Sequence, residues 1–366
     1  MNQLNEFIEG KIVRPLIRFA LPILLALCLQ SLYGAVDLLV AGRFGTSADV
    51  SAVATGSQMM QMVTSIIAGL SMGTTILAGQ AIGRKHDSDA GDIIGSSICF
   101  FFVLAIGITA AMLLITRPFT SIMRAPAEAF SKTMGYVRIC SAGTIFIVAY
   151  NVLGSIFRGL GDSHTPMFTV AAACVFNIAG DLLFADVFDL KAEGAALATV
   201  LAQCFSVILC ILMVRKRGLP FPFGKKNIRF HKTFIAKIMK IGLPVALQDG
   251  LVNISFLAIA SIVNTLGVTA SAGVGVAEKI CAFIMLVPSA FSQSLSAFAA
   301  HNVGAGRNNR ARKSMLCGMC ASLLAGIVMA YLAFFHGSIL AGIFAKEEGV
   351  ILAAADSIQS HRCVMI

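Results

Sequence analysis

The chain has 366 residues, of which 57% are hydrophobic and only 13% are charged, and its mean hydropathy is +0.86. An ordinary soluble domain carries about 25% charged residues, so this composition excludes a soluble enzyme, a disordered chain and a disulfide-rich secreted domain. The net charge of +10 does not indicate nucleic-acid binding, because the basic residues fall in short clusters between long apolar runs. We therefore predict an all-α, polytopic membrane protein.

Apolar runs long enough to cross a bilayer, about 20 residues each, recur along the chain. They predict membrane spans at 16–41, 50–80, 93–115, 132–157, 166–188, 194–214, 235–263, 271–300 and 314–335, and the start of a tenth near residue 350. With these spans, nineteen Lys and Arg residues fall on the side of the N-terminus and six on the other side. Because cytoplasmic loops are enriched in basic residues, we expect the N-terminus in the cytoplasm.

The two parts of the chain resemble each other at an offset of 222 residues. Leu21 and Pro22 match Leu243 and Pro244, and after one deletion Gly83 matches Gly304. Six spans per half predict two parallel, pseudo-symmetric six-helix bundles with a substrate cavity between them, as in many transporters. The predicted organisation is an N-terminal membrane lobe over 1–217, a basic cytoplasmic linker over 218–234 and a C-terminal membrane lobe over 235–366. The second lobe is incomplete beside the first, so we expect a C-terminally truncated chain.

Acidic side chains inside apolar spans are the strongest candidates for function, since inserting one costs about 2.5–3.5 kcal/mol. Asp37, Asp181 and Thr199 each lie six to eight residues from the outer end of their span, so all three have a similar predicted depth. Asn177 precedes Asp181 by four residues and shares its helix face. Burial and mutual repulsion would favour proton uptake by at least one carboxyl group. We predict a cation or proton site here; the alternative is that the aspartates cap or bridge helices.

Further polar residues are candidates for the wall of a substrate cavity. Gln30 and Tyr33 precede Asp37 on the same predicted helix by seven and four residues. Candidates on other spans are Ser57, Met60, Asn151, Gln248, Asp249 and Asn253. For Asp249 two interpretations stay open, a cavity residue or a hydrogen-bonding partner between helices.

Motifs for other chemistries are missing or incomplete in the sequence. A single CxxC has no second pair to complete a metal site, and no ATP-binding motif or catalytic motif of an intramembrane enzyme is present. We therefore predict a protein that is not an enzyme, has no cofactor and draws its energy from an ion gradient. The pairs Gly69/Gly73 and Gly91/Gly95 predict close packing between helices.

Together these residues resemble the multidrug and toxic compound extrusion (MATE) family, in its bacterial DinF-like branch. The resemblance covers nearly all of residues 10–355 and is carried by Pro22, Asp37 and the stretches 79–84, 158–166, 177–181, 194–199 and 302–307. It implies a monomeric twelve-span antiporter in the bacterial inner (plasma) membrane, surrounded by lipid. Such a protein exports small amphipathic, often cationic molecules by alternating access, in exchange for H⁺ or Na⁺.

The resemblance also assigns roles to residues. It implies a cation site in the N-terminal lobe formed by Asp37, Asn177, Asp181 and Thr199, beside a cavity lined by Gln30, Tyr33, Ser57, Met60 and Asn151. The branch that binds Na⁺ in its C-terminal lobe carries a Glu in the seventh span, and here no Glu follows Pro244 before Glu278. This departure favours H⁺, with Na⁺ at Asp37 and Asp181 as the alternative. Two alternative functions are a flippase for a lipid-linked or polysaccharide precursor, which basic cavity residues would favour, and a non-transporting fragment.

Overall fold

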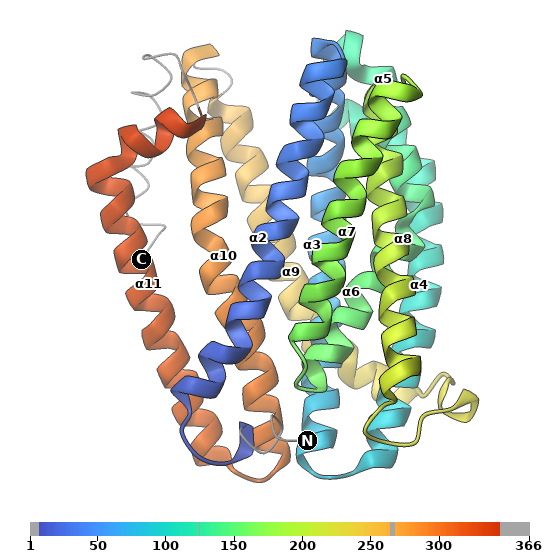
Figure 1. The fold of residues 1–366 in the computed structure, drawn as a ribbon, viewed down its shortest axis with the longest axis vertical. Helices are drawn as coiled ribbons and strands as arrows, with labels where there is room; N and C mark the ends of the chain where they lie inside the picture. The colour runs from blue at the N-terminus through green and yellow to red at the C-terminus, as the bar shows by residue number, and fades with distance from the viewer. Residues whose placement is uncertain (1–6, 124, 264–267, 345–366) are drawn as a thin grey trace.

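The computed structural model describes residues 7–123, 125–263 and 268–344, which form a bundle of long helices without a β-strand (Figure 1). The helices are α2 (Val13–Phe44), α3 (Ser47–Gly83), α4 (Asp87–Ile122), α5 (Ala127–Ala142), α6 (Thr144–Gly159), α7 (His164–Leu182), α8 (Lys191–Arg217), α9 (Lys232–Val263), α10 (Val268–Gly304) and α11 (Asn308–Phe344). Among the described residues, seven helices are long and apolar enough to cross a membrane, or up to eight if α5 and α6 form one bent span. The predicted fold class is confirmed.

Each of the nine predicted spans lies in a helical part of the described structure, and in two of them the α-helix is interrupted. The span predicted over 132–157 is split into α5 and α6, which meet at an angle of 53°. The bend lies at Gly143, where a Cβ would come within 2.4 Å of the Val200 side chain on α8. The span predicted over 166–188 leaves α-helical geometry after Leu182 and ends in a short π-helical turn, η1 (Leu183–Val187). The predicted start of a tenth span near residue 350 lies outside the described residues.

Helix α3 occupies the centre of the bundle and packs against α5, α6, α9 and α10. Two glycines let the backbone of α9 approach it closely. A Cβ at Gly69 would lie 2.6 Å from Ala246 Cα, and one at Gly73 would lie 2.4 Å from the Ile238 carbonyl oxygen. The predicted close packing at this glycine pair is confirmed, and it joins the first part of the chain to the second.

The second glycine pair, Gly91 and Gly95, packs against the linker between α8 and α9. The prediction of close packing holds for this pair, but the predicted partner, another transmembrane helix, is wrong. A Cβ at Gly95 would lie 2.0 Å from the Asn227 carbonyl oxygen. The Asn227 side chain also donates to Asp92 at 2.9 Å, and Arg229 pairs with Asp92 at 3.4 Å. Because Gly91 and Gly95 have no side chains, α4 has room for the linker backbone around the 3-10 helical turn η2 (Lys225–Asn227), and sequence spacing does not distinguish such a partner from a transmembrane helix.

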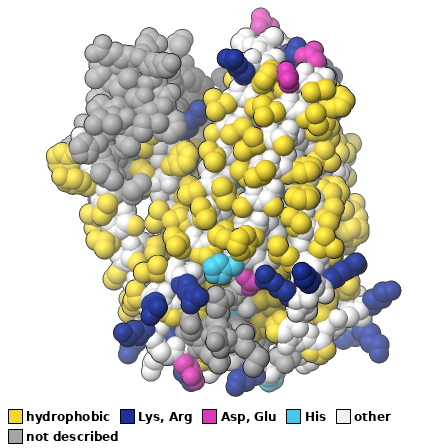
Figure 2. Space-filling view, viewed as in Figure 1, with side chains coloured by type: hydrophobic (Ala, Val, Ile, Leu, Met, Phe, Trp, Pro, Cys, Tyr) yellow, Lys and Arg dark blue, Asp and Glu magenta, His cyan; other side chains and the backbone are white. Residues whose placement is uncertain are grey.

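Basic side chains gather at one end of the molecule, below a band of hydrophobic side chains (Figure 2). We name this the basic end; it carries the loops at 84–86, 160–163, 218–231 and 305–307 (Figure 1). The N-terminal segment 7–12 also packs here. Phe7 is buried against Phe19 of α2 and against Phe298 and His301 of α10. This aromatic cluster joins the N-terminus and the starting turns of α2 to the C-terminal part of the described chain.

Candidate functional site

The predicted cation-site residues come together inside the bundle formed by α2, α7 and α8. Asp37 of α2 is 4% exposed, and Asn177 and Asp181 of α7 are each 1% exposed. The Thr199 hydroxyl of α8 donates to Asp37 Oδ2 at 3.3 Å. The side chains of Asp181 and Asn177 lie beside the Asp37 carboxyl group, near enough to interact with it electrostatically. Three helices thus place two carboxyl groups, an amide and a hydroxyl at one buried point.

Several polar atoms of this acidic cluster (Asp37, Asn177, Asp181 and Thr199) have no hydrogen-bond partner among the described residues. They are Asp37 Oδ1, both carboxyl oxygens of Asp181 and both polar atoms of the Asn177 amide. A buried polar atom left unpaired costs about 1–3 kcal/mol, and a cation or proton bound here would offset that cost. Among the described residues neither carboxyl group caps a helix end: the Asp181 oxygens accept no hydrogen bond, and Asp37 accepts its one hydrogen bond from Thr199 of α8. Asp37 thus links α2 to α8 and lies beside Asp181 of α7, so the alternative that the aspartates bridge helices stays open.

A small cavity opens beside the cluster, on the other side of Thr199. Its volume is about 20 Å³, which is room for roughly one water molecule. The Gln30 amide donates to the Tyr150 hydroxyl at 2.6 Å across it. The lining residues are Gln30, Tyr33, Tyr150, Val170, Ala173, Thr199, Ala202, Gln203 and Ser206. Gln30 and Tyr33 thus line a small cavity next to the acidic cluster.

The remaining predicted cavity residues of the first lobe do not line this cavity. Met60 is buried in the apolar core between α3, α5 and α8. Ser57 donates to the Ala54 carbonyl at 3.1 Å, and Asn151 donates to the Ile147 carbonyl at 2.8 Å. Both hydrogen bonds stay within the residue's own helix. The Ser57 hydroxyl and the Asn151 amide are therefore already paired with backbone carbonyls and do not need a substrate as partner.

The predicted cavity residues of α9 also lie away from the acidic cluster. Gln248 is exposed, and Asp249 and Asn253 are half-buried. The Asn253 amide donates to the Asp249 carbonyl oxygen at 2.7 Å, again within one helix. Among the described residues, the Asp249 carboxyl group makes no hydrogen bond to another helix, so that interpretation of Asp249 finds no support here.

Three polar residues of the cavity wall were missed by the sequence prediction. Gln203 and Ser206 follow Thr199 by four and seven residues, and this spacing repeats on one face of a helix. The same spacing that linked Gln30 and Tyr33 to Asp37 could have found them. Tyr150 gave no such signal, because it approaches Gln30 from α6, a helix whose position depends on the bend at Gly143.

The fold defines a polytopic membrane protein. The MatE family model matches residues 22–183 and 244–360, and this match identifies the chain as a transporter and not an enzyme. The chain therefore belongs to the MATE family, and the family resemblance found in the sequence is confirmed.

Curated relatives and solved structures agree with this assignment. The chain is 26% identical over 355 residues to the probable multidrug resistance protein YoeA of Bacillus subtilis (strain 168), covering 95% of this chain and 75% of YoeA. It is 28% identical over 306 residues to the probable multidrug resistance protein YpnP of the same organism, covering 83% and 68%. A solved outward-facing multidrug resistance MATE family transporter superposes with a TM-score of 0.91 at 19% identity, covering all of this chain and 81% of that structure. That last similarity shows the fold alone.

Proposed function

We propose that the chain is a cation-coupled antiporter that exports small amphipathic, often cationic compounds by alternating access. In this proposal the basic end lies in the cytoplasm, as the distribution of basic residues favours. One observation carries the proposal: the Asp37 and Asp181 carboxyl groups interact inside the bundle while three of their four oxygens lack a hydrogen bond. The multidrug resistance named for YoeA and YpnP supports drugs as the exported compounds.

The acidic cluster is suited to switching between a loaded and an empty state. Two adjacent carboxylates repel each other strongly in a low-dielectric interior. Binding of a proton or a Na⁺ ion removes that repulsion, so each state of the cluster favours its own packing of α2 against α7 and α8. Uptake of the cation and binding of the exported compound are then coupled, because each biases the same conformational equilibrium. The missing seventh-span Glu makes H⁺ the favoured ion.

The packing at the basic end supports the access state that we assign to this structure. A Cβ at Gly83 would lie 2.2 Å from the His301 carbonyl oxygen, and one at Gly304 would lie 2.2 Å from the Gln80 carbonyl oxygen. Helices α3 and α10 are therefore in backbone contact there, which closes the cytoplasmic side. We infer an outward-facing state, in keeping with the outward-facing conformation of the similar solved transporter.

A flippase is the less favoured alternative. A phosphate-bearing precursor would need cationic side chains along its path. None of the nine residues that line the small cavity is Lys or Arg. We therefore retain drug export as the proposed activity.

The test compares carboxyl variants of the chain in proteoliposomes. A fluorescent cationic dye is loaded, and its efflux is followed under an imposed pH gradient and, separately, an imposed Na⁺ gradient. We expect Asp37→Asn and Asp181→Asn to abolish gradient-driven efflux, with insertion and thermal unfolding unchanged. Asp186→Asn is the matched control, since Asp186 is exposed in η1 only five residues beyond Asp181. Undiminished efflux by both cluster variants would falsify the proposal, and the gradient that drives the wild-type chain identifies the ion.

A further inference from the structure

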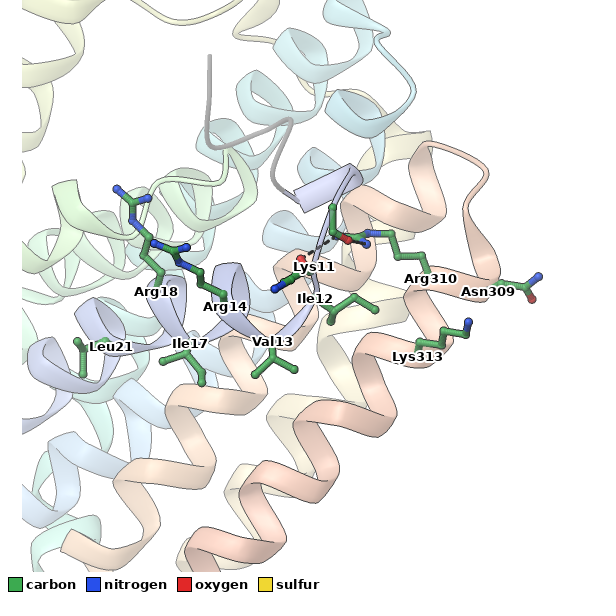
Figure 3. Close-up of a pocket in the computed structure, with 11 residues that line it drawn as sticks. Lys11, Ile12, Val13, Arg14, Ile17, Arg18, Leu21, Asn309, Arg310 and Lys313 are labelled. Carbon is green, nitrogen blue, oxygen red and sulfur yellow. Dashed lines mark hydrogen bonds between the residues drawn. The ribbon is translucent and has the colours of Figure 1, made fainter.

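An open groove of about 1340 Å³ lies at the basic end, between the start of α2 and the start of α11 (Figure 3). It is well separated from the acidic cluster and plays no part in the proposed ion coupling. Five of its eleven lining residues are Lys or Arg, and none is acidic. The groove is therefore a strongly positive surface at the boundary of the apolar band.

One of these cations builds the groove, and others are left to act on a ligand. Arg310 of α11 donates to the backbone carbonyl oxygens of Phe7, Glu9, Gly10 and Lys11, which fixes the N-terminal segment as one wall. Glu9, on the N-terminal segment, is already paired with Arg307 at 3.2 Å.

The cations available to a ligand come from both walls. Lys11, Arg14 and Lys313 are exposed and make no ion pair among the described residues. Lys11 and Arg14 come from the N-terminal segment and α2, and Lys313 comes from α11 on the other wall (Figure 3). An anion in the groove would be attracted by these charges without displacing a protein carboxylate.

The same groove has an apolar wall that leads away from the charges. Val13, Ile17 and Leu21 follow one another at intervals of four residues along α2, and Figure 3 shows their side chains in a row. Their side chains are 53%, 48% and 63% exposed. This row begins beside Lys11 and Arg14 and continues into the apolar part of α2. The groove thus offers cations for a head group and a hydrophobic track for a chain attached to it.

We propose that this groove is a binding site for an anionic phospholipid of the cytoplasmic leaflet. Its phosphate lies in the basic part of the groove, which Lys11, Arg14 and Lys313 line, and an acyl chain lies along the row from Val13 to Leu21. Basic pockets between transmembrane helices on the cytoplasmic side favour such head groups, and each nearby Lys or Arg adds roughly a five-fold gain in affinity. A soluble phosphate would use the cations but not the apolar row. The bound lipid would join α2 of the first lobe to α11 of the second.

The test measures lipid binding to the purified full chain in detergent. Phosphatidylglycerol and phosphatidylcholine with identical acyl chains are titrated separately, and bound lipid is counted by native mass spectrometry. The test variant is Lys11→Gln/Arg14→Gln/Lys313→Gln. The matched control is Arg84→Gln/Lys216→Gln/Lys226→Gln, which removes three exposed charges from the same end outside the groove. Lys313→Gln alone gives a second variant that leaves α2 and the N-terminal segment unchanged.

We expect the wild-type chain to bind phosphatidylglycerol more tightly than phosphatidylcholine. The triple variant should weaken phosphatidylglycerol binding by about ten-fold or more, and Lys313→Gln alone by about five-fold. The control variant should bind both lipids as the wild type does. Equal binding of the two lipids by the wild type, or unchanged phosphatidylglycerol binding by both groove variants, overturns the proposal. Displacement of phosphatidylglycerol by inorganic phosphate at equal concentration also overturns it, because the site would then be one for a soluble anion.

Discussion

Gly83 and Gly304 occupy equivalent positions in the two halves of the chain, and each packs against the backbone of the other's helix. Gly83 of α3 faces the carbonyl oxygen of His301, and Gly304 of α10 faces the carbonyl oxygen of Gln80. In both helices the facing carbonyl belongs to the residue three positions before the glycine. The internal repeat is therefore visible as a symmetric crossing of α3 and α10 at the basic end.

This crossing predicts that Gly83→Ala and Gly304→Ala are destabilising. A Cβ 2.2 Å from a backbone oxygen cannot be accommodated by a side-chain movement, so the two helices must separate. Overpacking of this kind costs about 1–3 kcal/mol, and thermal unfolding in detergent should show the loss. Gly107→Ala in α4 is the control, because a Cβ there has no neighbour within 4 Å. Equal unfolding temperatures for Gly83→Ala and Gly107→Ala would contradict the crossing.

A second prediction concerns the hydroxyl group in the acidic cluster. Thr199→Val removes the hydrogen bond to Asp37 Oδ2 at 3.3 Å but preserves the volume of the side chain. A hydrogen bond to a charged group contributes about 1.5–3 kcal/mol, so the ion concentration for half-maximal efflux should change by about ten-fold or more. Thr199→Ser keeps the hydroxyl and should behave as the wild type. The hydroxyl has no role in ion binding if the Val and Ser variants show the same ion dependence.

Much of this fold could be predicted because the bilayer imposes a simple pattern. The nine apolar segments correspond to described helices, and the repeat that matched Gly83 with Gly304 corresponds to a physical contact. Hydropathy reports the length of an apolar run but not its local geometry. It could not show the bend at Gly143, where the chain packs closely against Val200 of a helix more than fifty residues away.

For the candidate site too, the sequence predicted the depth of residues in the membrane but not their local hydrogen bonding. Distance from the span ends predicted a similar depth for Asp37 and Asp181, and in the structure the two side chains are buried beside each other. Residues such as Asn151 and Asn253 looked equally polar in sequence, yet each satisfies its amide on a carbonyl of its own helix. Which polar side chains bond locally and which face a cavity depends on helix rotation, and one sequence does not fix that rotation.

A third prediction concerns the end of the molecule opposite the basic end. Asp49, in the first turn of α3, accepts hydrogen bonds from the backbone nitrogen and the hydroxyl of Thr46 at 2.8 and 2.7 Å. It also pairs with Lys132 of α5 at 2.7 Å, and its side chain is 2% exposed. Asp49→Asn removes the ion pair and points amide hydrogens at donors, so we expect a loss of about 1–3 kcal/mol in the free energy of unfolding.

The control for Asp49 is an acid whose ion pair is open to solvent. Asp189 pairs with Lys191 at 3.5 Å, and its side chain is 77% exposed. Exposed pairs of this kind contribute little to stability, so Asp189→Asn should unfold as the wild type does. If chemical unfolding gives the two variants the same midpoint, the Asp49 network does not hold α3 to α5.

The last prediction concerns the hold of Arg310 on the N-terminal segment. Its guanidinium group donates to the carbonyl oxygens of Phe7 and Gly10 at 3.1 and 2.6 Å and also reaches those of Glu9 and Lys11. A lysine ammonium keeps the charge but cannot span these carbonyls, because it lacks the planar fork of donors. Arg310→Lys should therefore release the segment and speed hydrogen exchange at the amides of residues 8–11. Arg312→Lys, at an exposed position two residues along α11, should leave that exchange unchanged. Equal protection of the segment in both variants would show that Phe7 and its aromatic neighbours, and not Arg310, hold the N-terminus against α10.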